Sequence, residues 1–301
     1  MGNSKIPYCT RVWNPVEGCA PCSPGCDHCW ARSMAYRYSQ NSVFYINGEN
    51  KYADIARWDG TLAEFPARWD EPLHWRKPQV VFVGSRSDVA LWPVEALTKV
   101  DDVAYWNSRH QFLLLTKRPA LLVQKAQAAL WRENPNVWLG ITVWDQASHV
   151  AAAPWLCVWQ GVGLHTWLSV EPMLGPIDMH VGEDMGDDED SGVGCVPCDA
   201  GGRRHQHLLH EDCGRGLIDW VVVGGESGKG ARPFDAAWAR SLRDQCASAG
   251  IDFWFKQWGD GDIRGGGGLR GPELHDGMAY LDGILHHAAP APIARILEAR
   301  R

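Results

Sequence analysis

The sequence contains no apolar run long enough to cross a membrane, because its longest apolar stretches have the length of single strands. It also shows no apolar signal segment near its start, and we therefore expect a cytoplasmic protein without a membrane partner. Basic residues are not in excess: 29 Lys and Arg stand against 36 Asp and Glu, and the net charge is −7. Any contact with nucleic acid would need a local basic patch.

The composition is that of a globular protein. Apolar residues make up 45% of the 301 positions, which is enough for a sizeable core. The length allows one large domain or two modest ones. Ten cysteines and seventeen tryptophans stand out against this background. With no export signal, clustered cysteines indicate metal binding more than disulfides.

Short apolar runs alternate with amphipathic segments along the chain. The runs predict strands at 11–13, 80–84, 112–116, 137–143, 167–170, 220–224 and 253–256. The segments between them predict helices at 33–39, 93–108, 120–131, 146–155 and 236–249. Strands that are apolar on both faces and alternate with helices are typical of parallel sheets. We therefore expect an α/β fold, as a partial or full parallel (β/α) barrel, with a flat doubly wound sheet as the alternative.

Polar residues follow nearly every predicted strand. In a parallel barrel these positions share one rim, where active sites are built. These rim positions include Ser85, Lys117, Glu171, Glu226 and Lys256. Mutual ion pairing at the barrel mouth is the structural alternative for the charged members of this group.

Two stretches interrupt the alternation of strands and helices. Residues 180–216 begin with an acidic low-complexity run and continue with cysteines and histidines, which predicts an inserted loop. The stretch 260–301 is rich in glycine, then in alanine and proline, and predicts a peripheral C-terminal extension that ends in a short helix at 293–300. The barrel itself is thus expected within residues 1–259.

Four cysteines lie within eleven residues, Cys19, Cys22, Cys26 and Cys29, in the run GCAPCSPGCDHCWA. Prolines and a glycine break this run, so it forms neither a helix face nor a strand face, and its sulfurs can converge. An iron–sulfur cluster, a zinc ion and local disulfides are the three alternatives. A four-thiolate zinc site usually takes two knuckles far apart in sequence, whereas a single short loop suits a cubane cluster better.

A second group of metal-binding residue types lies in the 180–216 insertion. Cys195 and Cys198 form a C-x2-C knuckle, and His210 with Cys213 gives the best second pair for a tetrahedral zinc site. The insertion has too few apolar residues to fold alone, so zinc would supply its stability. A flexible loop with free thiols and a second iron–sulfur cluster are the alternatives.

Blocks of sequence in a fixed order carry a resemblance to a known family. The chain resembles the radical S-adenosylmethionine (SAM) superfamily and, more closely, a phage- and prophage-associated three-cysteine-motif family described as radical-SAM-like. The blocks are WNPVEGCAPCSPGCDHCWARSMA, FVGSRSD, LLLTKRP, NVWLGITVWDQ, LSVEPMLGPID, IDWVVVGGESGKGARP and SLRDQCASAGIDFWFKQWG. They span roughly residues 11–259.

The resemblance implies a 4Fe–4S cluster held by Cys19, Cys26 and Cys29, with Cys22 as the alternative first ligand. It implies that an open iron binds SAM, and that reduction by an electron donor yields a 5′-deoxyadenosyl radical. Glu171 and Glu226 would then contact the SAM ammonium or ribose.

The remaining expected SAM-binding residues come from four parts of the sequence. The GGES block, with Gly224 and Gly225, would let a backbone approach the ligand closely. Lys117 and Arg118 are expected partners for the SAM carboxylate or for a substrate phosphate. Ser85 and Lys256 complete the expected cofactor site.

The leading hypothesis from the sequence is a radical SAM-type enzyme that acts on a nucleic acid or nucleotide. The alternative is a non-catalytic metal-binding module that binds DNA or a phage or host protein. A closed site in which both Cys19 and Cys22 are ligands would favour the module.

Overall fold

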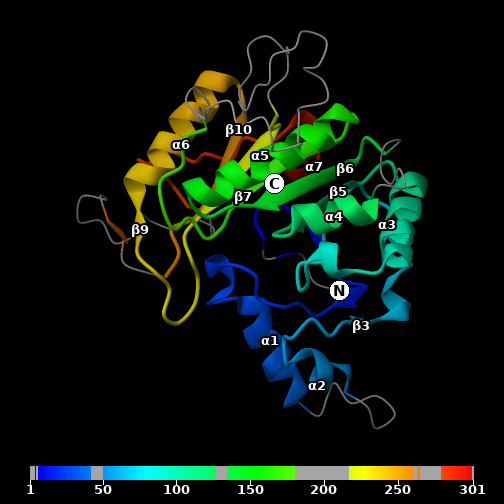
Figure 1. Cartoon of the computed structure of the whole chain (residues 1–301). Coiled ribbons are helices and arrows are strands. Elements are labelled where there is room, and N and C mark those ends of the chain that lie inside the picture. The colour runs from blue at the N-terminus through cyan, green and yellow to red at the C-terminus, as the bar shows by residue number, and fades with distance from the viewer. Residues whose placement is uncertain are drawn as a thin grey trace, which may run out of the picture. The chain divides into compact units, whose positions relative to one another are not determined.

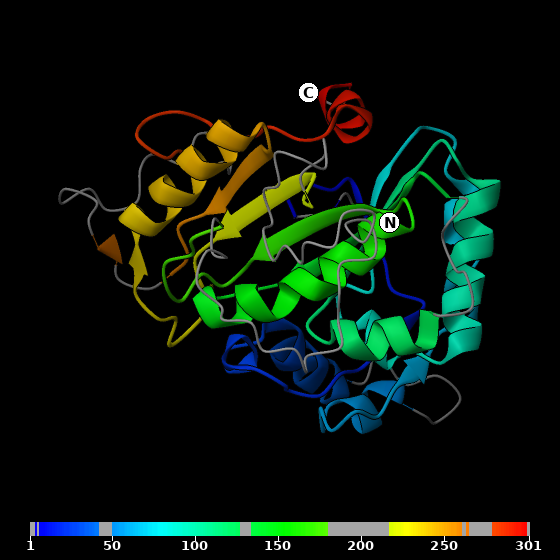
Figure 2. The same cartoon turned by 45° about the horizontal axis from the view of Figure 1, so that its top comes forward.

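The structure is a computed structural model that describes residues 4, 6–41, 50–126, 134–179, 217–260, 263–264 and 279–299 (Figures 1 and 2). The chain divides into two compact units. The first comprises residues 1–138 and 292–301, and the second comprises residues 139–291.

Parallel strands form the centre of each unit. The strands are β1 (Arg11–Trp13), β4 (Val80–Val83), β5 (Gln111–Thr116), β6 (Val137–Thr142), β7 (His165–Val170), β8 (Trp220–Gly224) and β10 (Asp252–Gln257). The first unit has the order β1-β4-β5-β6, and the second has the order β6-β7-β8-β10, because the unit boundary falls within β6. The pairs β1–β4, β4–β5, β7–β8 and β8–β10 are parallel.

These strands lie where the sequence predicts them, within two residues at each end. The α/β class and the parallel pairing are therefore confirmed. The closure of the strands into a barrel of the radical SAM type stays a prediction.

Except for α2, which was not predicted, the helices match the predicted segments, with two instructive differences. They are α1 (Trp30–Ser39), α2 (Lys51–Ile55), α3 (Val94–Trp106), α4 (Pro119–Ala126), α5 (Gln146–Gly161), α6 (Ala236–Ala249) and α7 (Ala291–Glu298). The helix α5 runs six residues past its predicted end, although it contains Pro154, because Leu156 and Trp159 bury their side chains. The helix α1 begins three residues early, with Cys29 as its N-cap.

Short elements were not predicted, since they have no periodicity to detect. Antiparallel β2 (Val16–Glu17) and β3 (Ala63–Glu64) pair in the first unit, and β9 (Phe234–Asp235) and β11 (Ile263–Arg264) pair in the second. The helices α1 and α2 pack together (Figure 1). In the second unit α5 packs on β7 and α6 packs on β10 (Figure 2).

Tryptophans fill the core of each unit. In the first unit Trp13 stacks edge-on against Trp69 and Phe112, with ring centroids 5.7 and 6.0 Å apart. In the second unit Trp167 and Trp220 lie 5.8 Å apart. Gly140 permits the packing of Trp167, because a Cβ at this position would stand 2.4 Å from the indole.

Part of the C-terminal stretch, residues 279–291, belongs to the second unit, and residues 292–299 belong to the first. Phe255 donates its N–H to His286 O at 2.8 Å, and Ala288 N–H donates to Phe253 O at 3.1 Å. The side chain of Leu281 is fully buried. Residues 286–288 therefore pair with β10 at the edge of the sheet. The predicted domain limits at 259 and at 180–216 stay predictions, since residues 180–216 lie outside the described ranges.

None of the helices in the described part of the chain is long and apolar enough to cross a bilayer.

Candidate functional site

The cysteine loop joins β2 to α1 in the first unit. It contains the single 3-10 turn η1 (Pro24–Cys26), closed by the Cys26 N–H donating to Ser23 O at 2.9 Å. Cys29 N–H then donates to Cys26 O at 3.3 Å, and Cys29 caps α1. The four thiols thus come from irregular backbone and one tight turn, as the breakers in the sequence indicate.

A glycine fixes the direction in which the chain enters the loop. Gly18 has a φ of +108°, a backbone conformation that residues other than glycine rarely adopt. A Cβ at Gly18 would lie 2.2 Å from the carbonyl oxygen of Thr61. Its N–H donates to Arg86 O at 3.2 Å. The position of Cys19 therefore depends on a residue without a side chain.

The four thiols differ in their surroundings. All are reduced; Cys22 is exposed, and the other three are partly buried. Cys19 and Cys29 both pack against one apolar cluster, which consists of Ala31, Ala35, Tyr52, Ile55 and Trp58. The apolar cluster shields one side of the loop from water.

The pKa values of two loop cysteines are raised, and that of a third is lowered. Burial raises the pKa of Cys19 to about 11, with a smaller contribution from the charge of Asp88. The Cys22 thiol donates a hydrogen bond to Cys26, which lowers the pKa of Cys26 to about 4 and raises that of Cys22. Cys26 is thus the thiol most readily deprotonated for metal binding.

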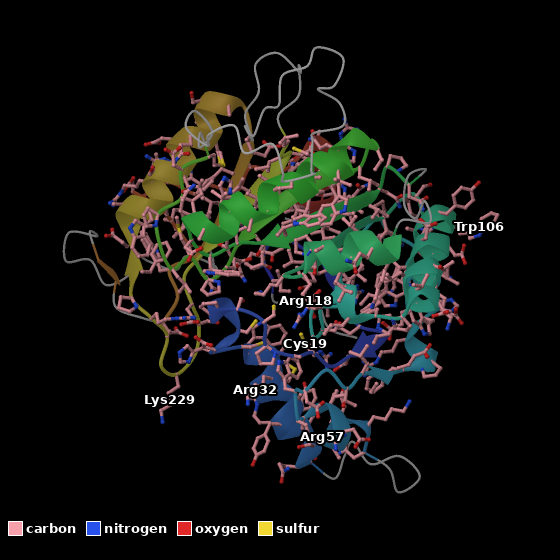
Figure 3. The ribbon with its side chains drawn as sticks, in the orientation of Figure 1. Cys19, Arg32, Arg57, Trp106, Arg118 and Lys229 are labelled. Carbon is pink, nitrogen blue, oxygen red and sulfur yellow. The ribbon has the colours of Figure 1, made fainter. Side chains whose placement is uncertain are left out.

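Two cations from the end of β5 lie near this loop. The charge of the predicted residue Lys117 lowers the pKa of Cys26, as the smallest of several influences on that thiol. The Arg118 guanidinium donates to Ala20 O at 2.5 Å and pairs with Asp88 at 2.8 Å. Figure 3 shows Arg118 next to Cys19, and its charge opposes the rise in the pKa of Cys19.

These residues fit a thiolate-ligated metal cluster in donor chemistry and charge. Reduced thiols, one of them easily ionised, stand on an anchored loop with two cations beside it. Within the described ranges, no three Cys, His, Asp or Glu side chains already converge as a ligand set. Cys22 is instead paired with Cys26, so cluster binding requires the sulfurs to rotate toward a common centre.

Ser85, which was predicted for the same rim, follows β4 in the first unit. Its hydroxyl donates to Asn14 Oδ1 at 3.1 Å. The Nδ2 of Asn14 is buried and has no hydrogen-bond partner among the described residues. Asn14 follows β1, and a buried amide of this kind could not be recognised from the sequence, because its burial depends on the strand pairing.

The predicted polar residues of the second unit are paired with one another. Lys256, from β10, lies 2.6 Å from Glu171 Oε1, and Ser169 Oγ donates to Glu171 Oε2 at 3.2 Å. A Cβ at Gly224 would stand 3.1 Å from the same Glu171 oxygen. The structure therefore brings Glu171, Gly224 and Lys256 together at the ends of their strands.

Glu226 forms an ion pair with Arg232, a partner that was not predicted from the sequence. Arg232 donates to Glu226 Oε2 from its backbone N–H and from Nε, both at 2.9 Å, and to Oε1 from Nη2 at 2.5 Å. No sequence signal distinguishes this ion pair from a ligand contact. The neighbouring Gly225 accommodates the backbone of Trp258, whose carbonyl oxygen would be 2.0 Å from a Cβ.

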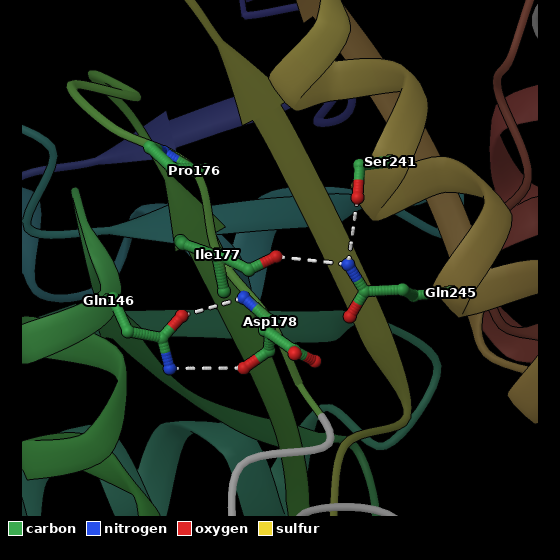
Figure 4. A pocket seen from close by; sticks show the side chains of 6 residues that line it. All are labelled: Gln146, Pro176, Ile177, Asp178, Ser241 and Gln245. Atoms are coloured by element: carbon green, nitrogen blue, oxygen red, sulfur yellow. Dashed lines mark hydrogen bonds between the residues drawn. The ribbon is translucent and has the colours of Figure 1, made fainter.

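A separate pocket in the second unit has its polar side chains engaged (Figure 4). It is lined by Gln146, Pro176, Ile177, Asp178, Ser241 and Gln245. Gln146 donates to Asp178 O and accepts from Asp178 N–H, while Gln245 donates to Ile177 O. The two amides thus hold the chain segment that precedes residue 180.

The predicted zinc ligands Cys195, Cys198, His210 and Cys213 lie outside the described residues. Cys157 and Cys246 are buried on α5 and α6.

In a comparison with known proteins, one family model matches most of the chain. Residues 3–290 match a family described as "Protein of unknown function (DUF5131)". The chain belongs to the DUF5131 family. No curated protein matches the chain, and no solved structure does.

The DUF5131 match covers both the cysteine loop and the paired residues of the second unit. The family description assigns no activity, so the function of this DUF5131 chain is argued from its residues alone.

Proposed function

We propose that this DUF5131 chain is an iron–sulfur enzyme of the radical SAM type. The observation that carries the proposal is the loop of four reduced thiols, fixed at Gly18 and flanked by Lys117 and Arg118. Cys19, Cys26 and Cys29 would hold a 4Fe–4S cluster, with Cys22 as the alternative first ligand. When bound, such a cluster supplies the electron for reductive cleavage of SAM.

The chain's own residues prepare this site in two ways. The apolar cluster behind Cys19 and Cys29 excludes water from one side of the loop. Lys117 and Arg118 offset the negative charge that three thiolates bring together.

The proposed contacts of SAM remain Glu171, Gly224, Gly225, Glu226, Lys256, Lys117 and Ser85. Glu171 and Glu226 each hold a cation in this structure. A SAM ammonium would therefore have to exchange with Lys256 or Arg232 to reach either carboxylate.

A nucleic acid or nucleotide is the proposed substrate, and an external electron donor the proposed reductant. The support for this substrate class is the resemblance of the motif blocks to a phage-associated, radical-SAM-like family. A cytoplasmic location fits the free thiols of the loop, which stay reduced in that compartment. A partial parallel (β/α) barrel is the proposed form of the sheet.

One observation favours the second candidate function, a non-catalytic metal-binding module that binds DNA or a phage or host protein. Cys22 is hydrogen-bonded to Cys26, and so lies close enough to join the same ligand set. Four thiolates would close the site and leave no open iron.

The decisive experiment is anaerobic reconstitution of the full chain with iron and sulfide. The proposal expects the absorbance and electron paramagnetic resonance (EPR) signals of a 4Fe–4S cluster, and 5′-deoxyadenosine release from SAM after addition of dithionite. A cluster that does not cleave SAM would contradict the enzyme and favour the module. Absence of any cluster would contradict the enzyme and would also contradict a module that binds iron.

Single cysteine variants identify the ligand set. Cys19→Ala should abolish the cluster, and Cys22→Ala should retain it. Cys157→Ala is the matched control, because Cys157 is buried on α5 in the other unit and should not affect iron content. If Cys22→Ala lost the cluster and Cys19→Ala kept it, Cys22 would be the first ligand in place of Cys19.

A further inference from the structure

Arg118 links the end of β5 to the cysteine loop. Its Nη1 pairs with Asp88 Oδ2 at 2.8 Å, and its backbone N–H donates to Thr116 Oγ1 at 2.8 Å. Thr116 in turn donates to Asp88 Oδ1 at 2.6 Å, and Lys117 N–H donates to Asp88 Oδ2 at 3.1 Å. Asp88 and the end of β5 therefore fix the guanidinium in one orientation.

The guanidinium then reaches the backbone between two of the thiols. Arg118 Nη2 donates to the carbonyl oxygen of Ala20, which follows Cys19 directly. The neighbouring carbonyl, that of Cys19, accepts from the Gly60 N–H at 3.1 Å. The contact at Ala20 comes from a charged side chain, whereas the contacts at Gly18 and Cys19 come from backbone groups.

Burial makes this arginine unsuited to the substrate contact that the sequence suggests. The side chain of Arg118 is 15% exposed and that of Asp88 is 7% exposed. Both terminal nitrogens of the guanidinium already donate to protein oxygens. A phosphate or carboxylate would have to displace one of these bonds.

We propose that Arg118, oriented by Asp88, is the positioning residue of the cysteine loop and the cation that stabilises the reduced cluster. This inference rests on the proposed function and adds a residue to that same site. Partners that orient metal ligands without touching the metal commonly affect metal affinity. A positive charge beside a cluster also favours its reduced, more negative state.

The first test uses amide hydrogen exchange of the metal-free full chain and needs no cofactor. In Arg118→Gln, which removes the charge and shortens the side chain, the amides of residues 18–29 should exchange faster than in the wild type. Arg118→Lys keeps the charge but lacks the planar fork that spans Asp88 and Ala20, and should loosen the loop as well. Unchanged exchange in both variants would overturn the positioning role.

A matched control separates this effect from the general loss of an ion pair. Arg243 on α6 has a similarly sheltered side chain and pairs with Asp244 and Asp282 at 2.8 and 2.9 Å. Arg243→Gln should leave exchange of residues 18–29 at the wild-type rate. Equal loosening of the loop in this control would overturn the inference.

The second test measures the cluster itself after reconstitution. Arg118→Gln should weaken iron binding on the order of tenfold, as for other residues that orient ligands. An EPR-monitored redox titration should give a lower midpoint potential for Arg118→Gln, with recovery in Arg118→Lys. An unchanged potential would leave Arg118 with a purely structural role and overturn the proposal.

The two tests distinguish the inference from the function on which it rests. If the wild-type chain assembles no cluster, the proposed function fails, and the claim that Arg118 serves a cluster fails with it. Hydrogen exchange would still show whether Arg118 holds the loop.

Discussion

At the scale of single residues, Gly18 decides how the chain enters the cysteine loop. Its positive φ and the Thr61 oxygen at 2.2 Å from a Cβ exclude any side chain without movement of the backbone. We expect Gly18→Ala to lower the free energy of unfolding by about 2–4 kcal/mol, from backbone strain and overpacking together. Denaturant unfolding measures this loss, and iron content after reconstitution should fall in parallel.

Gly163 supplies the control for this prediction. It also has a positive φ, of +84°, but a Cβ there would meet no atom within 4 Å. Gly163→Ala should therefore show the strain alone, about 1–2 kcal/mol, and leave iron content unchanged. Equal losses in the two variants would mean that the contact with Thr61 relaxes without cost.

At the scale of elements, the two-residue strand β2 depends on a buried carboxylate. Glu17 is nearly inaccessible, and it pairs with Arg68 and, at 3.0 Å, with Arg86. Tyr52 donates its hydroxyl to Glu17 at 3.3 Å. These side-chain bonds join β2 to η3 (Pro66–Arg68) and to the loop after β4, where two ladder residues alone would be weak.

Glu17→Gln should be strongly destabilising, because it leaves two guanidiniums without their carboxylate. We expect a loss of about 3 kcal/mol in the free energy of unfolding, near the lower end for broken buried pairs since both arginines retain some exposure. Glu64→Gln is the control: its pair with Lys99 is about half exposed and contributes less than about 1 kcal/mol. Similar unfolding curves for the two variants would contradict the structural role of Glu17.

The sequence could predict those elements that carry a side-chain pattern of their own. Strands such as β4 and β8 are continuous apolar runs with turn residues at their ends, so their place and parallel pairing follow from the sequence. The strands β2 and β3 carry no pattern, because their pairing is set by contacts such as that of Glu17 with Arg68. The C-terminal residues beside β10 were missed because backbone hydrogen bonds, rather than side-chain pattern, attach them.

The candidate site likewise has a part that the sequence predicts and a part that it does not. The crowding of Cys19, Cys22, Cys26 and Cys29 on an irregular loop was predictable, because prolines and glycines break the run. The partners of the charged residues were not. Arg232 on Glu226 and Asp88 on Arg118 come from neighbouring strand ends or turns, and a sequence does not state which charges meet.

At the scale of the whole molecule, the segment 180–216 is bounded by two fixed points in the second unit. Met179 N–H donates to Gln245 Oε1 at 2.7 Å, and Leu217 O accepts from Thr166 Oγ1 at 2.6 Å. The side chains of Met179 and Ile218 are buried. The chain on both sides of the segment is therefore held by α6 and β7, independently of the segment itself.

Replacing residues 180–216 with a short Gly-Ser linker should accordingly leave the thermal unfolding midpoint nearly unchanged, since loop length has a weak effect on stability. Zinc measured by mass spectrometry should fall from about one per chain to none, as expected for a Cys195, Cys198, His210 and Cys213 site. Iron bound after reconstitution should stay at the wild-type level. The full-length double variant Cys195→Ser and Cys198→Ser should lose zinc equally. Zinc retained in both variants would instead place the metal at Cys19–Cys29, where a closed site favours the non-catalytic module.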